Sequence, residues 1–472
     1  MSGLFFKNII EVSRLLRNRK ISSFELVQQA LKRIRELEPN LNAYIKIMDQ
    51  EALQQARLAD HEFAEGHYRG PLQGIPIAIK DIFETKGIVT TAGSKVLSHW
   101  KPTRDAIVVR KLRAAGAVII GKTNLHEFAM GATTENPHFG STHNPWNLSK
   151  IPGGSSGGSA VAVATGTCYG ALGTDTGGSI RLPSSLCGIV GLKPTYNLID
   201  RLGCVPLSWS LDHIGPMSRT IDDCALLLQA IADSKTLNQK HLNVSLENIA
   251  TIDTQTIKIG ICQNYFFKNV EDDIQMMIEQ AELDLEKLGF HFVDIKIEGI
   301  EKALNAQKII SKAEAYVIHR ATFVKHPDYF GEDVRYRLQS GAKVMAYDYI
   351  QAQRVRRVFV QNVKDAMRDC DLLLAPTHAI TPFDIGERGA EESITNIFKL
   401  GKTPIGNILG FPILTIPCGF LSNGLPVGMQ LIGKPYSEAL LLSIGKIYEA
   451  AHDWINYYEK NKAYLKSEGI SK

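Results

Sequence analysis

Two glycine-rich stretches dominate the middle of the chain, Ile151-Pro-Gly-Gly-Ser-Ser-Gly-Gly-Ser159 and Gly173-Thr-Asp-Thr-Gly-Gly-Ser-Ile-Arg181. In each of them a serine, Ser155 or Ser179, directly follows a Gly-Gly pair. Glycine lets a ligand approach the main chain closely. A hydroxyl beside bare backbone N–H groups supplies a nucleophile and an oxyanion hole, which acyl transfer needs. The pattern therefore indicates a serine nucleophile.

The alternative is that these Gly/Ser runs are flexible linkers. Both runs adjoin apolar segments, 160–164 after the first and 168–172 before the second. A linker does not normally lie in the middle of a chain between two core-like segments. The flanks therefore favour a built site over a linker.

Composition excludes several classes of function. The chain has 472 residues, is 44% hydrophobic and carries a formal charge of only +4, which does not indicate a nucleic-acid or membrane partner. No segment approaches the 18 apolar residues of a membrane span, and no unbroken apolar stretch near the N-terminus indicates a signal peptide. The seven cysteines are odd in number and lack Cys-x-x-Cys spacing, so we expect reduced thiols in a cytoplasmic protein, with no disulfide framework, metal site or cofactor.

The order of predicted elements indicates an α/β fold. Residues 1–65 form a helical N-terminal lead-in, in which Ser22 and Glu25 make a capping box and Pro39 is expected to end the helix. From 66 to 460 strands and helices alternate without an internal repeat or a clear hinge, which predicts one large catalytic domain. Within it we expect strands at 117–120, 257–262 and 371–375, helices at 105–116, 220–231, 271–288, 303–320 and 344–368, and a surface loop at 234–256.

A lysine ends the apolar run that precedes Asp81. Lys80 closes a short β-type segment that contains Ile75, Ile77 and Ile79. Such a lysine can extend its amine to the surface. Alternatively, it lies in a dry pocket where desolvation lowers its pKa and makes it usable as a base. The segment by itself leaves both interpretations open.

Two further patterns match known motifs in letters only. Residues 116–123 fit the phosphate-loop pattern G-x-x-x-x-G-K-T, but the four middle residues have the character of a strand instead of a loop. Residues 154–158 fit the G-x-S-x-G nucleophile elbow, which requires a buried strand before it, whereas the preceding segment is polar and contains Pro152. Nucleotide binding and an α/β-hydrolase triad are therefore disfavoured.

Several ordered stretches together resemble the amidase signature family. They are Gly74-Ile-Pro-Ile-Ala-Ile-Lys-Asp81, Gly121-Lys-Thr-Asn124, Pro152-Gly-Gly-Ser-Ser-Gly-Gly-Ser159, Gly173-Thr-Asp-Thr-Gly-Gly-Ser-Ile-Arg-Leu-Pro183 and Gly188-Ile-Val-Gly-Leu-Lys-Pro-Thr195. The resemblance extends from about residue 70 to 460. It implies a large mixed β-sheet sandwiched between helices, in agreement with the alternation of elements.

The resemblance also implies a Ser-cisSer-Lys triad. Ser179 matches the nucleophile, Ser155 matches the bridging serine with a cis peptide bond, and Lys80 matches the base. A neutral lysine would take the proton of the attacking serine through the hydroxyl relay. Further positions match the oxyanion hole and substrate pocket (Thr176, Gly177, Gly178, Ser179 and Ala129) and the supporting groups (Ser156, Asp175 and Arg181).

Two subfamilies are compatible with these motifs. One is a stand-alone amidase that hydrolyses a small carboxamide to acid and ammonia, with a homodimer as one possible assembly. The other is the A subunit of a glutamyl-tRNA(Gln) amidotransferase, a glutaminase that supplies ammonia to partner subunits. The second holds glutamine with an arginine, matched by Arg356, and an aspartate, whose position is occupied by Leu400. The missing carboxylate makes the stand-alone amidase the favoured prediction, without a direct nucleic-acid or membrane contact.

Overall fold

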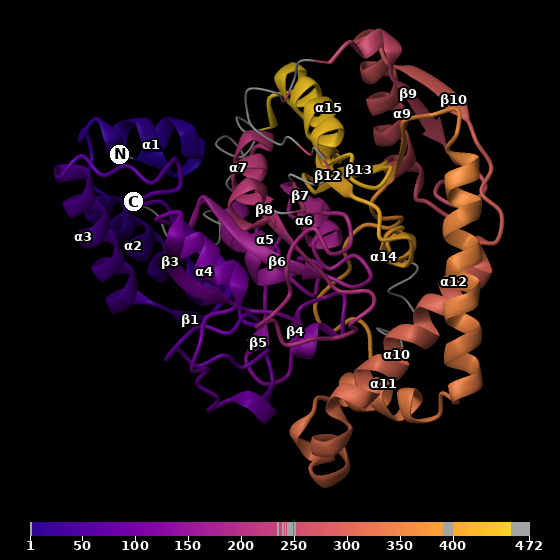
Figure 1. Cartoon of the computed structure of the whole chain (residues 1–472), viewed down its shortest axis with the longest axis horizontal. Coiled ribbons are helices and arrows are strands. Elements are labelled where there is room, and N and C mark those ends of the chain that lie inside the picture. Colours follow the sequence, from indigo (N-terminus) through magenta and orange to yellow (C-terminus); the bar gives the residue numbers. More distant parts are fainter. Residues whose placement is uncertain are drawn as a thin grey trace.

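The centre of the molecule is a mixed sheet of eleven strands (Figure 1). Strand β2 is parallel to both of its neighbours, β3 and β6, so the carboxyl ends of these three strands meet at one edge. Most other neighbouring pairs, such as β12 and β13, are antiparallel. In spatial order the strands are β1 (Tyr44–Ile47), β3 (Val118–Thr123), β2 (Pro76–Lys80), β6 (Gly170–Asp175), β8 (His213–Ser218), β7 (Val190–Lys193), β12 (Ile413–Phe420), β13 (Pro426–Gly433), β11 (Leu372–Pro376), β9 (Lys258–Ile261) and β10 (His291–Asp294).

This computed structural model describes residues 2–454, except 234–235, 238–239, 241, 243–248, 250–251 and 390–399. The loop predicted at 234–256 therefore lies largely outside the described residues. A separate hairpin joins β4 (Glu135–Asn136) to β5 (Gly140–Ser141). The α-helices are α1 (Ile9–Arg17), α2 (Ser23–Leu41), α3 (Asp49–Ala64), α4 (Ile107–Ala114), α5 (Gly157–Ala164), α6 (Arg181–Leu186), α7 (Ile221–Ile231), α9 (Asp272–Lys287), α10 (Ile300–Lys325), α11 (Glu332–Ala342), α12 (Ala346–Ala366), α14 (Pro404–Leu409) and α15 (Glu438–Ala451).

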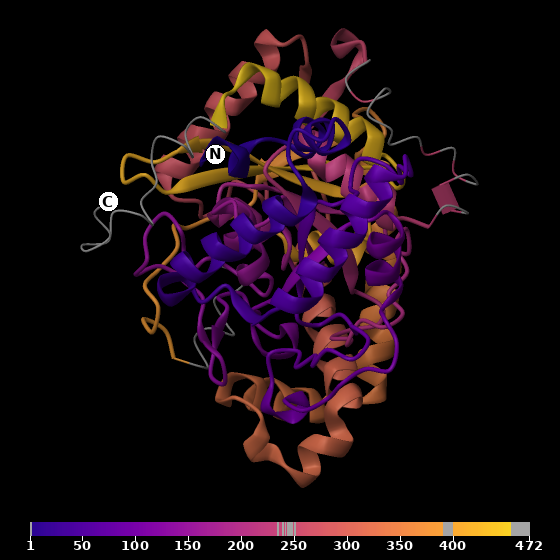
Figure 2. The ribbon, with the colours of Figure 1, turned by 90° about the vertical axis from the view of Figure 1, so that its left-hand side faces the viewer.

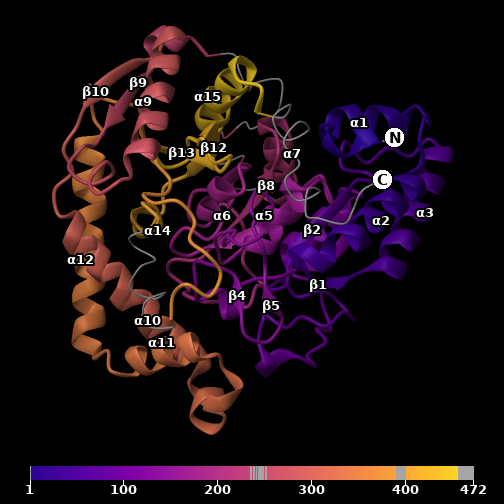
Figure 3. The ribbon, with the colours of Figure 1, turned by 180° about the vertical axis from the view of Figure 1, so that it is seen from behind.

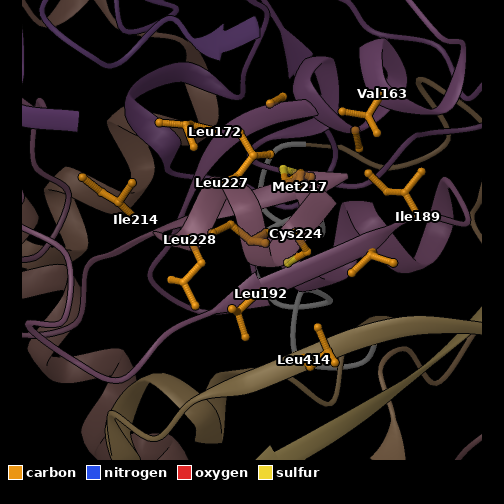
Figure 4. Close-up of a cluster of buried hydrophobic side chains, with 14 of the residues drawn as sticks. Val163, Leu172, Ile189, Leu192, Ile214, Met217, Cys224, Leu227, Leu228 and Leu414 are labelled. Carbon is orange, nitrogen blue, oxygen red and sulfur yellow. The ribbon is translucent and has the colours of Figure 1, made fainter. Parts of the chain in front are cut away.

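Helices cover both faces of the sheet. A Cβ atom on Gly170 of β6 would meet Leu227 of α7, whereas one on Gly173 would meet Ser156 and Ile180, beside α5 and α6. Because successive side chains of a strand alternate between faces, α7 and the α5–α6 pair lie on opposite sides. Figure 4 shows side chains of α7 packed among those of β6, β7 and β8. The predicted α/β fold with a sheet between helices is therefore confirmed.

Two groups of helices lie at opposite ends of the sheet. Helices α1–α3 lie at the end nearest β1, and they face the viewer in Figure 2. Helices α10–α12 lie at the other end, as Figures 1 and 3 show from two sides. Apolar side chains from Phe6 to Trp454 nevertheless belong to one continuous buried core. The division of the chain at residue 65 stays a prediction.

Most predicted elements agree with the structure, and one helix end does not. Ser22 and Glu25 form both hydrogen bonds of the predicted capping box. The prediction that this helix ends at Pro39 is wrong, because α2 continues to Leu41 and ends where Asn42 adopts a left-handed conformation. The left-handed conformation of Asn42, and not the proline, therefore marks the end of this helix.

Three negative predictions can be compared with the described residues. Residues 118–123 form β3, so the phosphate-loop pattern is indeed occupied by a strand. All seven cysteines are free thiols. In the part of the chain that the structure describes, none of the helices combines the length and apolar character that crossing a bilayer requires.

Candidate active site

Lys80 ends strand β2 with its side chain fully buried. Its Nζ donates hydrogen bonds to three hydroxyl oxygens, at 2.8 Å to Ser155 Oγ, 2.9 Å to Ser156 Oγ and 2.8 Å to Thr174 Oγ1. The strand end carries the amine to this position because β2 and β6 are parallel neighbours. The surface interpretation of Lys80 is therefore wrong, and the dry-pocket interpretation agrees with the structure.

The surroundings of Lys80 change its protonation. Burial lowers the pKa of Lys80 from 10.5 to about 7, against smaller opposing effects of Cys204, Asp175 and Asp212. An amine with this pKa is neutral in about half of the molecules at pH 7, whereas an ordinary lysine is almost wholly charged. Lys80 can therefore accept a proton near neutral pH.

The two glycine-rich stretches meet in the fold, and both are almost entirely buried. The Gly154–Ser155 peptide bond is cis. The backbone N–H of Ser156 donates to the carbonyl oxygen of Ser179 at 3.2 Å, which ties the first stretch to the second. Gly154 and Ser179 line the same cavity. This arrangement excludes the linker interpretation and joins the backbone of Ser179 to the stretch whose hydroxyls contact Lys80.

A buried ion pair supports the turn that carries Ser179. Arg181 Nη2 lies 3.0 Å from Asp175 Oδ1 and Arg181 Nε lies 3.0 Å from Oδ2, with both side chains fully buried. Asn407 of α14 bridges them, accepting from Arg181 at 2.8 Å and donating to Asp175 at 2.8 Å. Burial raises the pKa of Asp175, but the Arg181 guanidinium outweighs it and holds that pKa well below its usual range.

Residues 176–179 line the cavity and carry the N–H groups expected to form the oxyanion hole. Gly178 differs from its predicted oxyanion role, because its N–H donates to Asp175 Oδ1 at 2.8 Å. Within the described part of the chain, the N–H groups of Thr176, Gly177 and Ser179 have no hydrogen-bond acceptor. The turn is held from outside by Gln307 Nε2, which donates to Thr176 O at 3.3 Å, and by Thr403 Oγ1, which donates to Gly177 O at 2.7 Å.

The cavity at Ser179 has a volume of about 160 Å³. Ala129 lines it, together with Met130, Gly131 and Ala132 of the same segment. A cavity of about 150 Å³ is large enough for one benzene molecule. The space therefore suits a small organic substrate.

Several residues of this site were not predicted from the sequence. Thr174, which contacts Lys80, could have been found because β2 and β6 are both followed by site residues and end at the same edge. No local pattern points to the others, which come from distant helices and loops, namely Gln307, Lys308, Lys312, Arg337, Thr403 and Asn407. Within the described ranges, no group of three or more His, Cys, Asp or Glu side chains is arranged to hold a metal ion.

Comparison with known proteins identifies the family. The model of the family described as Amidase matches residues 25–442. This chain belongs to the amidase signature family. The similarity covers both glycine-rich stretches and Lys80, as well as the helices on both sides of the sheet.

Curated relatives of this amidase-family chain extend over nearly its full length. It is 39% identical to the A subunit of the glutamyl-tRNA(Gln) amidotransferase of Nostoc sp., covering 95% of this chain and 98% of the relative. It is 38% identical to the corresponding protein of Moorella thermoacetica, covering 96% and 98%.

Solved structures of two kinds share its fold. An amidase structure superposes with a TM-score of 0.85 and 31% identity, covering 94% of this chain and all of that one. The A subunit of the glutamyl-tRNA(Gln) amidotransferase of Thermotoga maritima superposes with a TM-score of 0.77 and 33% identity, covering 95% and 96%. A peptide amidase bound to chymostatin gives a TM-score of 0.83 at 31% identity, covering 94% and 97%.

The structure does not place the two residues matched to glutamine binding, Arg356 and Leu400, in a glutamine-binding arrangement at Ser179. Arg356 does not line the cavity at Ser179, and its Nε donates to the carbonyl oxygen of Ile408 at 2.9 Å. Leu400 is buried in an apolar cluster with Leu182, Ala132 and Phe383. Leu182 and Ala132 also line the cavity, so an apolar wall lies next to the predicted position of the carboxylate.

Proposed function

We propose that this chain is a serine amidohydrolase that converts a small carboxamide and water to a carboxylic acid and ammonia. Ser179 is the nucleophile, Ser155 the proton relay and Lys80 the base. The backbone N–H groups of Thr176, Gly177 and Ser179 form the oxyanion hole. No cofactor or metal ion takes part in this proposal.

The proposed reaction has two steps through an ester on Ser179. The neutral amine of Lys80 takes the proton of Ser179 through Ser155 while Ser179 Oγ bonds to the amide carbon. The oxyanion is held by the backbone N–H groups, and the protonated amine returns the proton to the leaving nitrogen as the C–N bond breaks. Water then attacks the ester with the same relay as base, which releases the acid and restores the Ser179 hydroxyl.

One observation carries the proposal, the buried amine of Lys80 within hydrogen-bond distance of Ser155, with its pKa lowered by burial to about 7. The membership of the family and the unoccupied N–H groups beside Ser179 support it. The Ser156 and Thr174 hydroxyls complete the shell around the amine and orient it toward the relay. The ion pair of Asp175 with Arg181 supports the turn that carries the nucleophile.

The destination of the ammonia distinguishes two candidate functions. The curated relatives reported above are all amidotransferase A subunits, and they support that function better than the stand-alone amidase favoured from the sequence. The apolar Leu400 at the position matched to the glutamine-binding aspartate supports the stand-alone amidase. Under the amidotransferase interpretation, the chain would act with partner subunits.

An ammonia-release assay tests the proposal and separates the two functions. The purified chain is assayed with glutamine, asparagine and simple aliphatic and aromatic amides, with and without candidate partner subunits and tRNA. Turnover of simple amides by the chain alone supports the stand-alone amidase. Activity on glutamine alone, increased by partners, supports the amidotransferase. Absence of ammonia from every amide, together with no labelling of Ser179 by a fluorophosphonate probe, contradicts the proposed chemistry.

A further inference from the structure

Three cationic side chains line the cavity that contains Ser179. Lys308 and Lys312 come from α10, where their spacing of four residues places them on one face of the helix. Arg337 comes from α11, which packs against α10 (Figure 1). None of the described residues that line this cavity is an aspartate or a glutamate. The cavity therefore has a strongly positive wall.

Arg337 is the member of this group best placed to bind a ligand. Its Nε is buried and has no hydrogen-bond partner among the described residues. The acidic side chain that acts on the charge of Arg337 is Asp333, whose Oδ2 already lies 2.6 Å from Nε2 of His126. Asp333 is thus shared between two cationic partners, and an anion in the cavity that Arg337 lines would add counter-charge to the guanidinium.

The electrostatics of the lysines point in the same direction. Burial lowers the pKa of Lys312, and the charges of Arg337 and Lys308 lower it further. The only hydrogen bond of the Lys312 amine among the described residues is a long one of 3.5 Å to Ser340 Oγ. An anion in the cavity would relieve this repulsion among like charges.

Apart from Gln307, the rest of the lining is small or apolar, which limits the kind of chain that can connect the anion to the amide. Alanine and leucine side chains make up the apolar part of the lining. Such a surface suits a short methylene chain, and arginine offers two parallel donors that match a carboxylate. The residues are Ala129, Ala132, Leu182, Leu207 and Ala315.

We infer that the substrate is a monoamide of an aliphatic dicarboxylic acid, whose carboxamide lies at Ser179 and whose free carboxylate binds Arg337, with Lys308 and Lys312 nearby. This inference rests on the proposed amidohydrolase function and names its substrate class. The same wall disfavours a free ammonium group next to the carboxylate, as in glutamine, because no acidic side chain of the lining would balance it.

Three amides of matched length test the charge preference. Glutaramate carries an anionic end, pentanamide a neutral end and 5-aminopentanamide a cationic end. We expect kcat/KM for ammonia release to be at least tenfold higher for glutaramate than for pentanamide, and lowest for 5-aminopentanamide. Glutamine should be a poorer substrate than glutaramate by at least tenfold. Equal values across the three amides, or a glutamine value that equals that of glutaramate, overturn the inference.

A pair of arginine variants locates the effect. In Arg337→Met the ratio of kcat/KM for glutaramate to that for pentanamide should fall at least tenfold, through a higher KM for glutaramate. Arg337→Lys should keep part of the preference. Arg335→Met is the matched control, because Arg335 is half-buried on the same helix and does not line the cavity. An unchanged ratio in Arg337→Met contradicts the assignment.

A binding measurement separates this inference from the proposed function. Calorimetry with the Ser179→Ala variant should show that glutaramate binds and that this binding weakens at least tenfold when Arg337→Met is added. The binding of pentanamide should not weaken in the same way. This readout needs no turnover. Binding without turnover by the wild type would contradict the proposed chemistry but support the anion site, whereas turnover without preferential binding of glutaramate would do the opposite.

Discussion

Lys80 Nζ lies 2.8 Å from Oγ1 of Thr174, and the two residues stand near the ends of neighbouring parallel strands. Three hydroxyl oxygens surround one buried amine, two from the first glycine-rich stretch and one, that of Thr174, from the second. Each of these oxygens accepts a hydrogen bond from the amine and so stabilises its charged form. The proton affinity of the base therefore depends on this shell.

Thr174→Val removes one of these acceptors while it keeps the side-chain shape. The charged amine loses stabilisation, so the pKa of Lys80 should fall, and the acidic limb of the pH profile of kcat/KM should move to lower pH. We expect kcat to fall about tenfold, because the loss of one hydrogen bond disturbs the position of the amine. Thr415→Val is the control, since the buried Thr415 hydroxyl has no described partner. A limb that moves to higher pH contradicts this account.

The pH dependence of the wild type follows from the sign of the Lys80 shift. The base must be neutral, and burial lowers its pKa to about 7. The value of kcat/KM should therefore be high above pH 7. Well below pH 7 it should fall about tenfold for each pH unit, because the amine becomes protonated. Lys80→Arg should be as inactive as Lys80→Ala because guanidinium does not lose its proton. An active Lys80→Arg enzyme would show that residue 80 acts only as a positive charge.

Replacement of the two proposed triad serines should abolish turnover without loss of the fold. Ser179→Ala removes the attacking oxygen, and Ser155→Ala removes the relay, so each should lower kcat by at least about 10³-fold. Intact-protein mass spectrometry should detect an acyl adduct in the wild type and none in Ser179→Ala. Circular dichroism and thermal melting provide the control for folding. More than a few per cent of wild-type turnover in Ser179→Ala contradicts the nucleophile assignment.

The buried Asp175–Arg181 pair should be important for stability. Asp175→Asn leaves the Arg181 charge buried without a counter-charge, and loss of one partner from a buried pair costs about 3–5 kcal/mol. We expect a clear drop in the melting temperature and in the denaturant midpoint. Asp384→Asn is the control because its ion pair with Lys150 is solvent-exposed and should matter little. Equal effects of the two substitutions would contradict the role of burial.

Gly178 is expected to tolerate no side chain. Its φ is +130°, and a Cβ atom there would overlap Thr403 Oγ1, which holds the carbonyl of Gly177. Gly178→Ala should therefore lower turnover more than tenfold, because the turn that carries Ser179 must shift. Gly424→Ala provides the comparison, since Gly424 also has a positive φ of +80° but a Cβ atom there would meet nothing within 4 Å. Gly424→Ala should lower the free energy of unfolding by no more than about 1–3 kcal/mol, through backbone strain, and should leave activity intact.

Local signals were sufficient for much of the scaffold. The capping box at Ser22 predicted the start of α2, and the apolar run before Asp81 predicted β2. These signals work because caps and strand patterns depend on residues close in sequence. The helix end at Pro39 was mispredicted because the position of a helix terminus depends on the backbone conformation at Asn42 and the packing around it.

The sequence by itself determined that the chain has an amidase-type site, because Lys80 and the two glycine-serine stretches lie within short, ordered motifs. It also showed that Leu400 replaces the expected carboxylate. Only the tertiary structure decided that Lys80 is buried, since its amine is enclosed by Ser155, Ser156 and Thr174, which are distant in the chain. The structure alone also joined Lys308 and Arg337 at one cavity, because α11 was not predicted and the contact of α10 with α11 is set by helix packing far from the motifs. Charge at a site is a sum over neighbours in space, so it cannot be read from positions that are distant in the chain.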